Sequence, residues 1–259
     1  MSSPRKNALV KTARSQRERG GSCLARNRLD YLKTSLIRPA AYRVWRKKAV
    51  LYGAAAAGRP PAILEVGCGQ GFFLRSWKKW FPAWRVFGSD IHFSGLLTAA
   101  RTGREALFVR HDARMIPFRG RIFNILCAFQ VIEHIPDPDR FLREAHRVLR
   151  EDGLLLLATP NPSGITARLL KDRWTGIRAD HVSLRSPSQW RSALEGAGYR
   201  VLDDGTTGLT RFPVLKWLPF GLLNWLPMAL LGYFRWERGE SYMAVARKSR
   251  PTPKKPAST

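Results

Sequence analysis

Cysteine, acidic residues and long apolar runs are all scarce in this chain of 259 residues. Its three cysteines, at positions 23, 68 and 127, form no spaced framework, which excludes a disulfide scaffold and indicates a reducing compartment. The first residues are rich in arginine and contain no continuous apolar stretch, so we expect no secretory signal peptide. These absences predict a cytoplasmic protein, with an organelle as the alternative because transit peptides are also arginine-rich and poor in acids.

Acidic residues number 19 against 45 lysines and arginines, which leaves a formal net charge of +26. Half of that charge lies in residues 1–61, where fifteen basic residues face only Glu18 and Asp30. A field of this sign favours anionic partners such as nucleic acid, an acidic lipid surface or a phosphorylated substrate. A general compositional bias is an equal alternative, because 33 of the 45 basic residues are arginine.

The apolar segment 210–236 lacks the uninterrupted run of about 20 apolar residues that a membrane-spanning helix needs. Three prolines break it, although Lys216 is its only charge between Phe212 and Phe234. Its tryptophans, its leucines and the flanking arginines suit either a lid over a substrate pocket or a segment that lies at a bilayer interface. The lid is the favoured interpretation, and the two are compatible if the substrate is a lipid.

The chain divides into a disordered basic tail (1–25), an N-terminal helical segment (26–61), one domain (62–248) and a second basic tail (249–259). Within the domain, apolar strand patterns alternate with helical patterns. This alternation predicts an α/β fold with a mostly parallel sheet and helices on both faces. The predicted strands are 62–66, 85–89, 106–110, 122–129 and 153–159, and the predicted helices are 71–81, 93–101 and 138–149.

Glycine occupies positions 67, 69 and 71 of the stretch AILEVGCGQGFFL, where the first strand turns into a helix. Glycine permits positive φ and has no Cβ, so a ligand can lie directly against the backbone there. The spacing is GxGxG, whereas a dinucleotide site has GxGxxG, and Phe72 stands where the third glycine would fall. Glu65, just before the turn, would repel a pyrophosphate, so the turn favours a cationic, nucleotide-like ligand.

Acids also follow the next two strands, and the carboxyl ends of such strands are where this class of sheet binds ligands. Asp90 lies 19 residues after Gly71, where a carboxylate accepts the hydroxyls of a ribose. Asp112 follows the third strand and is placed to accept from an adenine amine, and Phe129 ends the fourth strand. Either Asp alone could be a helix cap, but together with the glycine turn they predict a nucleotide-like cofactor.

The phrases EVGCGQG, GSDIH, HDARMIPF, FQVIEHIPDP and LREDGLLLLATPN occur in the order and spacing of the class I S-adenosylmethionine-dependent methyltransferases. Within this class, the chain most resembles the small-molecule branch, which includes ubiquinone-biosynthesis O-methyltransferases and related enzymes of glycan and lipid pathways. The resemblance covers about residues 62–248. It implies a Rossmann-like sheet of seven strands with the last antiparallel, and TTGL and SYMAVARK would supply the closing pair around the apolar insertion.

The same resemblance implies S-adenosylmethionine as the cofactor. The acid and glycines of the first turn would hold its methionine end, the second acid its ribose, and the third acid its adenine, with an aromatic ring over the open side. The implied cofactor residues are Glu65, Gly67, Gly69, Gly71, Asp90, Ile91, Asp112, Ala113 and Phe129.

Two histidines are candidates for the catalytic base that a protonated acceptor would require. His134 follows the fourth strand in IEHIPDP, where the alternative is that Glu133 and His134 only form the loop and cap the next helix. His181, in DHVSLRSPSQW, has the alternative of a structural role before a helix capped by Ser186. In the ubiquinone-pathway relatives two acids and a histidine of the first loop are implicated in binding a divalent metal. Gln130 takes the place of the first acid here, so no metal is predicted.

The predicted function is therefore methyl transfer to a small-molecule or lipid-linked acceptor, at oxygen, by a cytoplasmic enzyme that can lie peripherally on an anionic membrane. A second hypothesis is an RNA methyltransferase whose basic N-terminal arm follows the phosphates. Strand four ends in AFQV where base-amine methyltransferases have [DN]PP[YF], which disfavours base methylation but leaves ribose O-methylation open. A third hypothesis is a non-catalytic protein that uses the fold to bind nucleic acid or membrane.

Overall fold

The computed structural model describes residues 42–53, 60–103, 105–174, 176, 178–207 and 233–249. All of them fall within one unit, residues 40–259. The predicted tail 1–25, most of the tail 249–259 and residues 210–232 of the apolar segment lie outside the described residues. Among the described residues, no helix combines the length and the apolarity that crossing a membrane requires.

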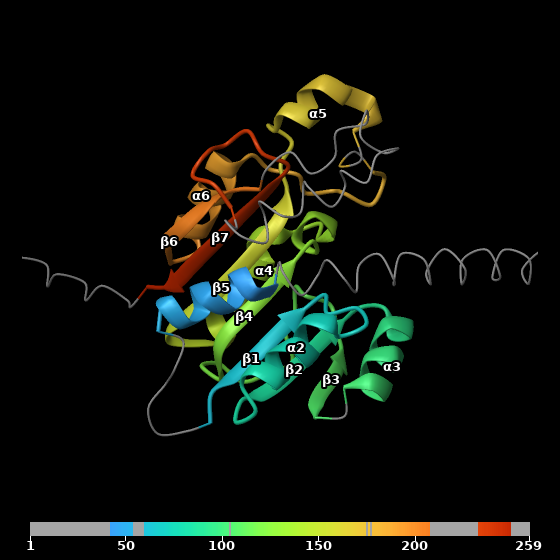
Figure 1. Ribbon diagram of the computed structural model, residues 1–259, viewed down its shortest axis with the longest axis vertical. Coiled ribbons are helices and arrows are strands. Elements are labelled where there is room, and N and C mark those ends of the chain that lie inside the picture. The colour runs from blue at the N-terminus through green and yellow to red at the C-terminus, as the bar shows by residue number, and fades with distance from the viewer. Residues whose placement is uncertain are drawn as a thin grey trace, which may run out of the picture. The chain divides into compact units, whose positions relative to one another are not determined.

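Strands and helices alternate along the chain, as Figure 1 shows. A helix at residues 42–51 comes before the first strand. The elements that follow are β1 (Ala62–Val66), α2 (Phe72–Trp80), β2 (Arg85–Asp90), α3 (Phe93–Thr102), β3 (Ala106–Arg110), β4 (Phe123–Phe129), the 3₁₀ turn η1 (Ile132–His134), α4 (Pro138–Val148), β5 (Leu149–Pro160), α5 (Ile165–Leu170), the 3₁₀ turn η2 (Lys171–Arg173), α6 (Pro187–Gly196), β6 (Tyr199–Thr206) and β7 (Ser241–Lys248).

The seven strands form one sheet in the order β3-β2-β1-β4-β5-β7-β6. β1, β2, β3, β4 and β5 run parallel, and β7 is antiparallel to both of its neighbours, β5 and β6. This is the Rossmann-like sheet with an antiparallel last strand that the sequence predicted. The order reverses between β1 and β4, and ligands bind at such reversals in open α/β sheets.

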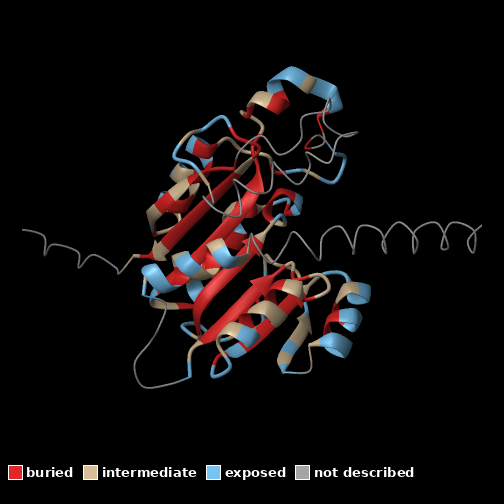
Figure 2. Ribbon diagram, in the orientation of Figure 1, coloured by how far each residue is buried: buried red, intermediate tan, exposed pale blue. Residues whose placement is uncertain are grey.

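Helices cover both faces of the sheet, and the central strands are buried along most of their length (Figure 2). On one face α4 and α6 pack against β1, β4 and β5 through side chains such as Phe141 and Trp190. On the other face the helix at 42–51 and α2 contribute Trp45 and Trp77. Because β1 and β4 are covered on both sides, only their ends reach solvent, and their ends are where the site must lie.

Most predicted boundaries agree with the observed ones to within one or two residues, and SYMAVARK forms β7 as expected. β5 differs, because it begins at Leu149 rather than at 153, and so does the other member of the closing pair. TTGL, at 206–209, was expected to supply a strand, whereas β6 runs over Tyr199–Thr206 and Thr207 already lies outside it. The strand therefore contains Asp203 and Asp204, residues that strands disfavour. Tertiary partners compensate: Asp203 pairs with Lys48, and Asp204 pairs with Arg191.

The Lys48–Asp203 ion pair joins the helix at 42–51 to β6, and the Asp203 side chain is only 4% exposed. Replacing Lys48 by methionine should lower the free energy of unfolding by about 2 kcal/mol, because the carboxylate stays buried without its main partner. The loss stays below the usual range for a buried pair since Arg235 lies 4.0 Å from the same carboxylate. Chemical denaturation measures the loss. Lys48→Met combined with Asp203→Asn should recover most of it, and a single variant as stable as the wild type would contradict the prediction.

Candidate active site

The carboxyl ends of β1, β2 and β4 are neighbours in the sheet, so the loops that follow Val66, Asp90 and Phe129 open at one edge. The predicted cofactor residues lie in these loops and in the loop after β3. The loops after β1 and β2 lead into helices, and the loop after β4 leads into the 3₁₀ turn η1. The loop after β3 leads directly to β4. The fold therefore brings together the segments that the sequence singled out.

The turn after β1 has a left-handed backbone at all three glycines, with φ of 73° at Gly67, 51° at Gly69 and 72° at Gly71. A Cβ added at Gly67 would lie 2.5 Å from a methyl carbon of Val131, so packing excludes a side chain there. A Cβ at Gly69 would meet no described atom within 4 Å. Gly67 is thus needed for the packing of the turn, whereas Gly69 presents bare backbone to open space.

Asp90 ties the end of β2 to that turn. Its Oδ2 accepts a hydrogen bond of 2.9 Å from the backbone N–H of Gly69, and its Oδ1 accepts one of 2.9 Å from His92. The carboxylate is therefore fixed in orientation beside the exposed glycine backbone. The next side chain, Ile91, is 52% exposed, an unusual amount for an isoleucine at the edge of a core. The assignment of Asp90 to a ribose and of Ile91 to the same site stays a prediction.

Two carboxylates lie close to the glycine turn. Burial raises the pKa of the Cys68 thiol, and the nearby charges of Glu65 and Asp90 raise it further. Cys68 is therefore an inert small residue of the turn. Glu65 is itself buried, at 6% exposure. Carboxylates at this point suit the sulfonium and ammonium groups of S-adenosylmethionine.

Asp112, predicted to bind the adenine amine, has a close partner in Arg114. The guanidinium donates to both carboxylate oxygens at distances of 2.7 to 3.1 Å. These hydrogen bonds lower the pKa of Asp112 to about 2, so the group is ionised at any ordinary pH. The sequence analysis missed Arg114. An adenine amine would share this carboxylate with the guanidinium, and Ala113 beside it packs partly against the core.

Phe129, expected to cover the cofactor, packs against the helix at 42–51. Its ring stacks on Trp45 with centroids 4.8 Å apart and meets the edge of Phe73 at 5.1 Å. The ring is thus held in place by an aromatic neighbour from a segment far away in sequence. The apolar periodicity placed Trp45 in a helix but gave no sign that it packs against Phe129. Whether Phe129 contacts the cofactor stays a prediction.

The loop after β4 and the connection between β5 and α6 bring the two catalytic candidates together. His134 lies in η1, and its ring meets that of His181 edge-on, with centroids 4.6 Å apart. Glu133 beside them is 1% exposed, and burial raises its pKa, as burial lowers the pKa of His181. The oxygen and nitrogen atoms that these three side chains offer lie within 4.8 Å of one another.

Neither His134 nor His181 caps a helix. The cap of α4 is Asp137, whose carboxylate accepts from the N–H of Arg140, so the expected alternative of a cap at Glu133 or His134 is wrong. Ser186 caps α6 as predicted, in a reciprocal pair with Gln189. His181 precedes that cap and contacts His134. The caps of α4 and α6 therefore use none of the three clustered side chains.

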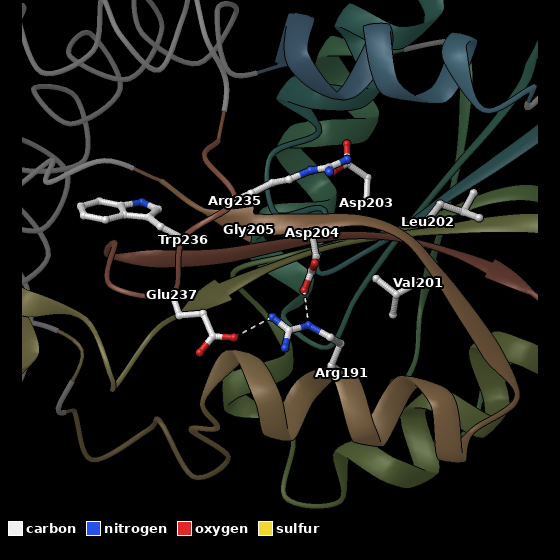
Figure 3. A pocket seen from close by; sticks show the side chains of 9 residues that line it. All are labelled: Arg191, Val201, Leu202, Asp203, Asp204, Gly205, Arg235, Trp236 and Glu237. Carbon is white, nitrogen blue, oxygen red and sulfur yellow. Dashed lines mark hydrogen bonds and ion pairs between the residues drawn. The ribbon is translucent and has the colours of Figure 1, made fainter.

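A cavity of about 350 Å³ lies elsewhere, at the outer strand β6 (Figure 3). Its charges are largely paired with one another: Arg191 donates to Asp204 at 2.7 Å and to Glu237 at 2.9 Å. The cavity is therefore distinct from the predicted cofactor site. Its lining residues are Arg191, Val201, Leu202, Asp203, Asp204, Gly205, Arg235, Trp236 and Glu237.

Comparison with known proteins agrees with this geometry. A family model described as a methyltransferase domain matches residues 38–204. The malonyl-[acyl-carrier protein] O-methyltransferase of Legionella pneumophila is 30% identical over 119 residues, which cover 45% of this chain and 41% of that protein. The ubiquinone biosynthesis O-methyltransferase of Bartonella bacilliformis is 23% identical over 163 residues, with coverage of 61% and 50%. The chain spans about half the length of the curated relatives it matches.

Among solved structures, an S-adenosylmethionine-dependent methyltransferase from Mesorhizobium loti superimposes with a TM-score of 0.55 over 76% of this chain and 95% of its own. Its identity of 18% supports the fold alone. The family model covers well over half of the chain. The chain belongs to the methyltransferase-domain family and has the fold of the class I S-adenosylmethionine-dependent methyltransferases.

Proposed function

We propose that this methyltransferase transfers the methyl group of S-adenosylmethionine to an oxygen of a small-molecule or lipid-linked acceptor. The observation that carries the proposal is the cluster of Glu133 and His134, which follow β4, with His181 from the connection between β5 and α6. β4 is the direct neighbour of β1, whose following turn carries the three glycines. A hydroxyl acceptor arrives protonated, and a polar cluster beside the cofactor gives its proton somewhere to go.

The chemical step is a direct displacement. A lone pair of the acceptor oxygen forms a bond to the methyl carbon while the carbon–sulfur bond breaks, and its electron pair stays on sulfur as a neutral thioether. The oxygen then carries a positive charge unless its proton leaves. Alignment of oxygen, methyl and sulfur alone can remove roughly 7–11 kcal/mol of the barrier. The remaining task for this chain is to help the proton leave.

The relatives support oxygen as the acceptor atom. The Legionella pneumophila protein is named for O-methylation of a malonyl group on an acyl-carrier protein, and the Bartonella bacilliformis protein for O-methylation in ubiquinone biosynthesis. Both names give oxygen as the methylated atom, and the first names a group linked to a carrier protein. The apolar segment 210–236 of this chain would suit a lipid-linked acceptor, as a lid or at the surface of an anionic membrane.

Purified protein supplied with S-adenosylmethionine labelled on its methyl group should transfer the label, in a cell extract, to material that extracts into organic solvent or passes a small-molecule filter. The linkage should be identified as an ether or ester by mass spectrometry of the product, with a mass increase of one methylene. Asp90→Ala serves as the inactive control. Label that nuclease releases would favour the RNA hypothesis, and an N-methyl or C-methyl product would contradict oxygen as the acceptor.

A further inference from the structure

The hydrogen bonds of the two clustered histidines show which ring nitrogen carries the hydrogen. Nδ1 of His134 lies 2.9 Å from the carbonyl oxygen of Asp180, and Nδ1 of His181 lies 2.7 Å from that of Gly176. A carbonyl oxygen only accepts, so each Nδ1 carries the hydrogen and each neutral ring leaves a lone pair on Nε2. An Nδ1–H bonded to a carbonyl is the arrangement that orients metal-binding histidines.

Glu133 adds a carboxylate that is likewise held in position. Its side chain is buried at 1% exposure, and its Oε2 accepts a hydrogen bond of 3.2 Å from the Thr159 hydroxyl on β5. The backbone of Glu133 also accepts from the N–H of Ser183, which ties η1 to the segment that carries His181. Two imidazoles and one carboxylate are thus fixed by hydrogen bonds from β5 and from the connection between β5 and α6.

We propose that Glu133, His134 and His181 bind one divalent transition-metal ion of the zinc type. Two nitrogen ligands and one oxygen ligand suit Zn²⁺ and Co²⁺, whereas Mg²⁺ and Ca²⁺ prefer oxygen ligands throughout. One candidate ligand atom of each side chain lies within 4.8 Å of those of the other two, so the three side chains face a common point. Three protein ligands leave a coordination position open, as catalytic sites of this metal do.

The third ligand explains why the sequence predicted no metal. Gln130 replaces the first acid of the loop, and it is exposed at the end of β4 with a φ of 54°. His181 supplies a third ligand from a different loop and makes the set richer in nitrogen. The site itself stands on these three side chains, and only its role rests on the proposed function. When bound, such an ion lowers the pKa of a hydroxyl that coordinates to it.

Metal binding can be measured directly on the full-length protein after treatment with a chelator. Calorimetric titration with Zn²⁺ should show one ion per chain, and Co²⁺ should give visible absorption bands of a low-coordinate site. His181→Ala should weaken Zn²⁺ binding more than tenfold and remove the Co²⁺ bands, because it removes a ligand outright. Millimolar Mg²⁺ should not displace Zn²⁺. His92→Ala removes an exposed histidine outside the cluster and should leave binding unchanged.

Glu133→Gln keeps the shape of the buried side chain and should also weaken Zn²⁺ binding, while S-adenosylmethionine binding in both variants shows that the fold persists. The proposal is overturned if the wild type binds no Zn²⁺ at one equivalent, if His181→Ala binds it as well as the wild type, or if His92→Ala loses as much. Metal binding without any O-methyl product would instead contradict the proposed function alone, so the two failures are distinguishable.

Discussion

Replacing Asp90 by alanine should lower the affinity for S-adenosylmethionine about 100-fold. If the carboxylate accepts both ribose hydroxyls, the variant loses charge-assisted hydrogen bonds that contribute about 1.5–3 kcal/mol each. It also loses the carboxylate that holds the Gly69 N–H at 2.9 Å, so the turn itself is less well fixed. A net loss of about 3 kcal/mol corresponds to two orders of magnitude in the dissociation constant.

Calorimetric titration of the purified variants with S-adenosylmethionine measures this effect. Asp90→Asn keeps one oxygen acceptor and should lose less affinity than Asp90→Ala. Glu195→Ala is the matched control, because it removes an exposed acid from α6 that makes no contact with the glycine turn. Equal affinity of Asp90→Ala and the wild type would show that the ribose assignment is wrong, provided that thermal unfolding confirms an intact fold.

Local patterns were enough to predict most of the sheet. β1 and β4 are short runs that are apolar except for Glu65 and Asn124, and such runs are typical of central parallel strands buried on both faces. The cap of α6 was readable for the same reason, since Ser186 and Gln189 stand three residues apart in the sequence and bond to each other. A feature whose interacting residues all lie within one helix or strand can be predicted without knowledge of the tertiary structure.

Features that depend on two distant segments could not be predicted. The acids of β6 resemble a loop until Lys48 and Arg191 are seen to pair with them. Phe129 acquires its stacking partner Trp45 only when the helix at 42–51 folds back onto the sheet. The sequence favoured a structural role for His181, because nothing in its own segment shows that its ring meets that of His134. Each of these contacts is set by the topology of the sheet.

The glycine turn can be tested by two substitutions, one of which should mainly lower stability and the other mainly lower cofactor affinity. Gly67→Ala should lower the free energy of unfolding by about 3 kcal/mol. A left-handed backbone costs a non-glycine residue about 1–2 kcal/mol, and the added Cβ would lie 2.5 Å from Val131 and overpack the turn. Gly69→Ala has the backbone cost alone, about 1 kcal/mol, because no described atom lies within 4 Å of its Cβ.

The two variants should rank in the opposite order for cofactor affinity, with the larger loss in Gly69→Ala. The Cβ of Gly69→Ala occupies the open space beside Asp90, where the cofactor is expected, so affinity should fall at least tenfold while the protein stays largely folded. Denaturant unfolding and calorimetry on the same preparations separate the two effects. Adding Val131→Ala to Gly67→Ala should restore the steric part of the lost stability and leave the backbone part. If Gly69→Ala binds S-adenosylmethionine as the wild type does, the cofactor does not lie against this turn, because a methyl group placed there would have to meet it.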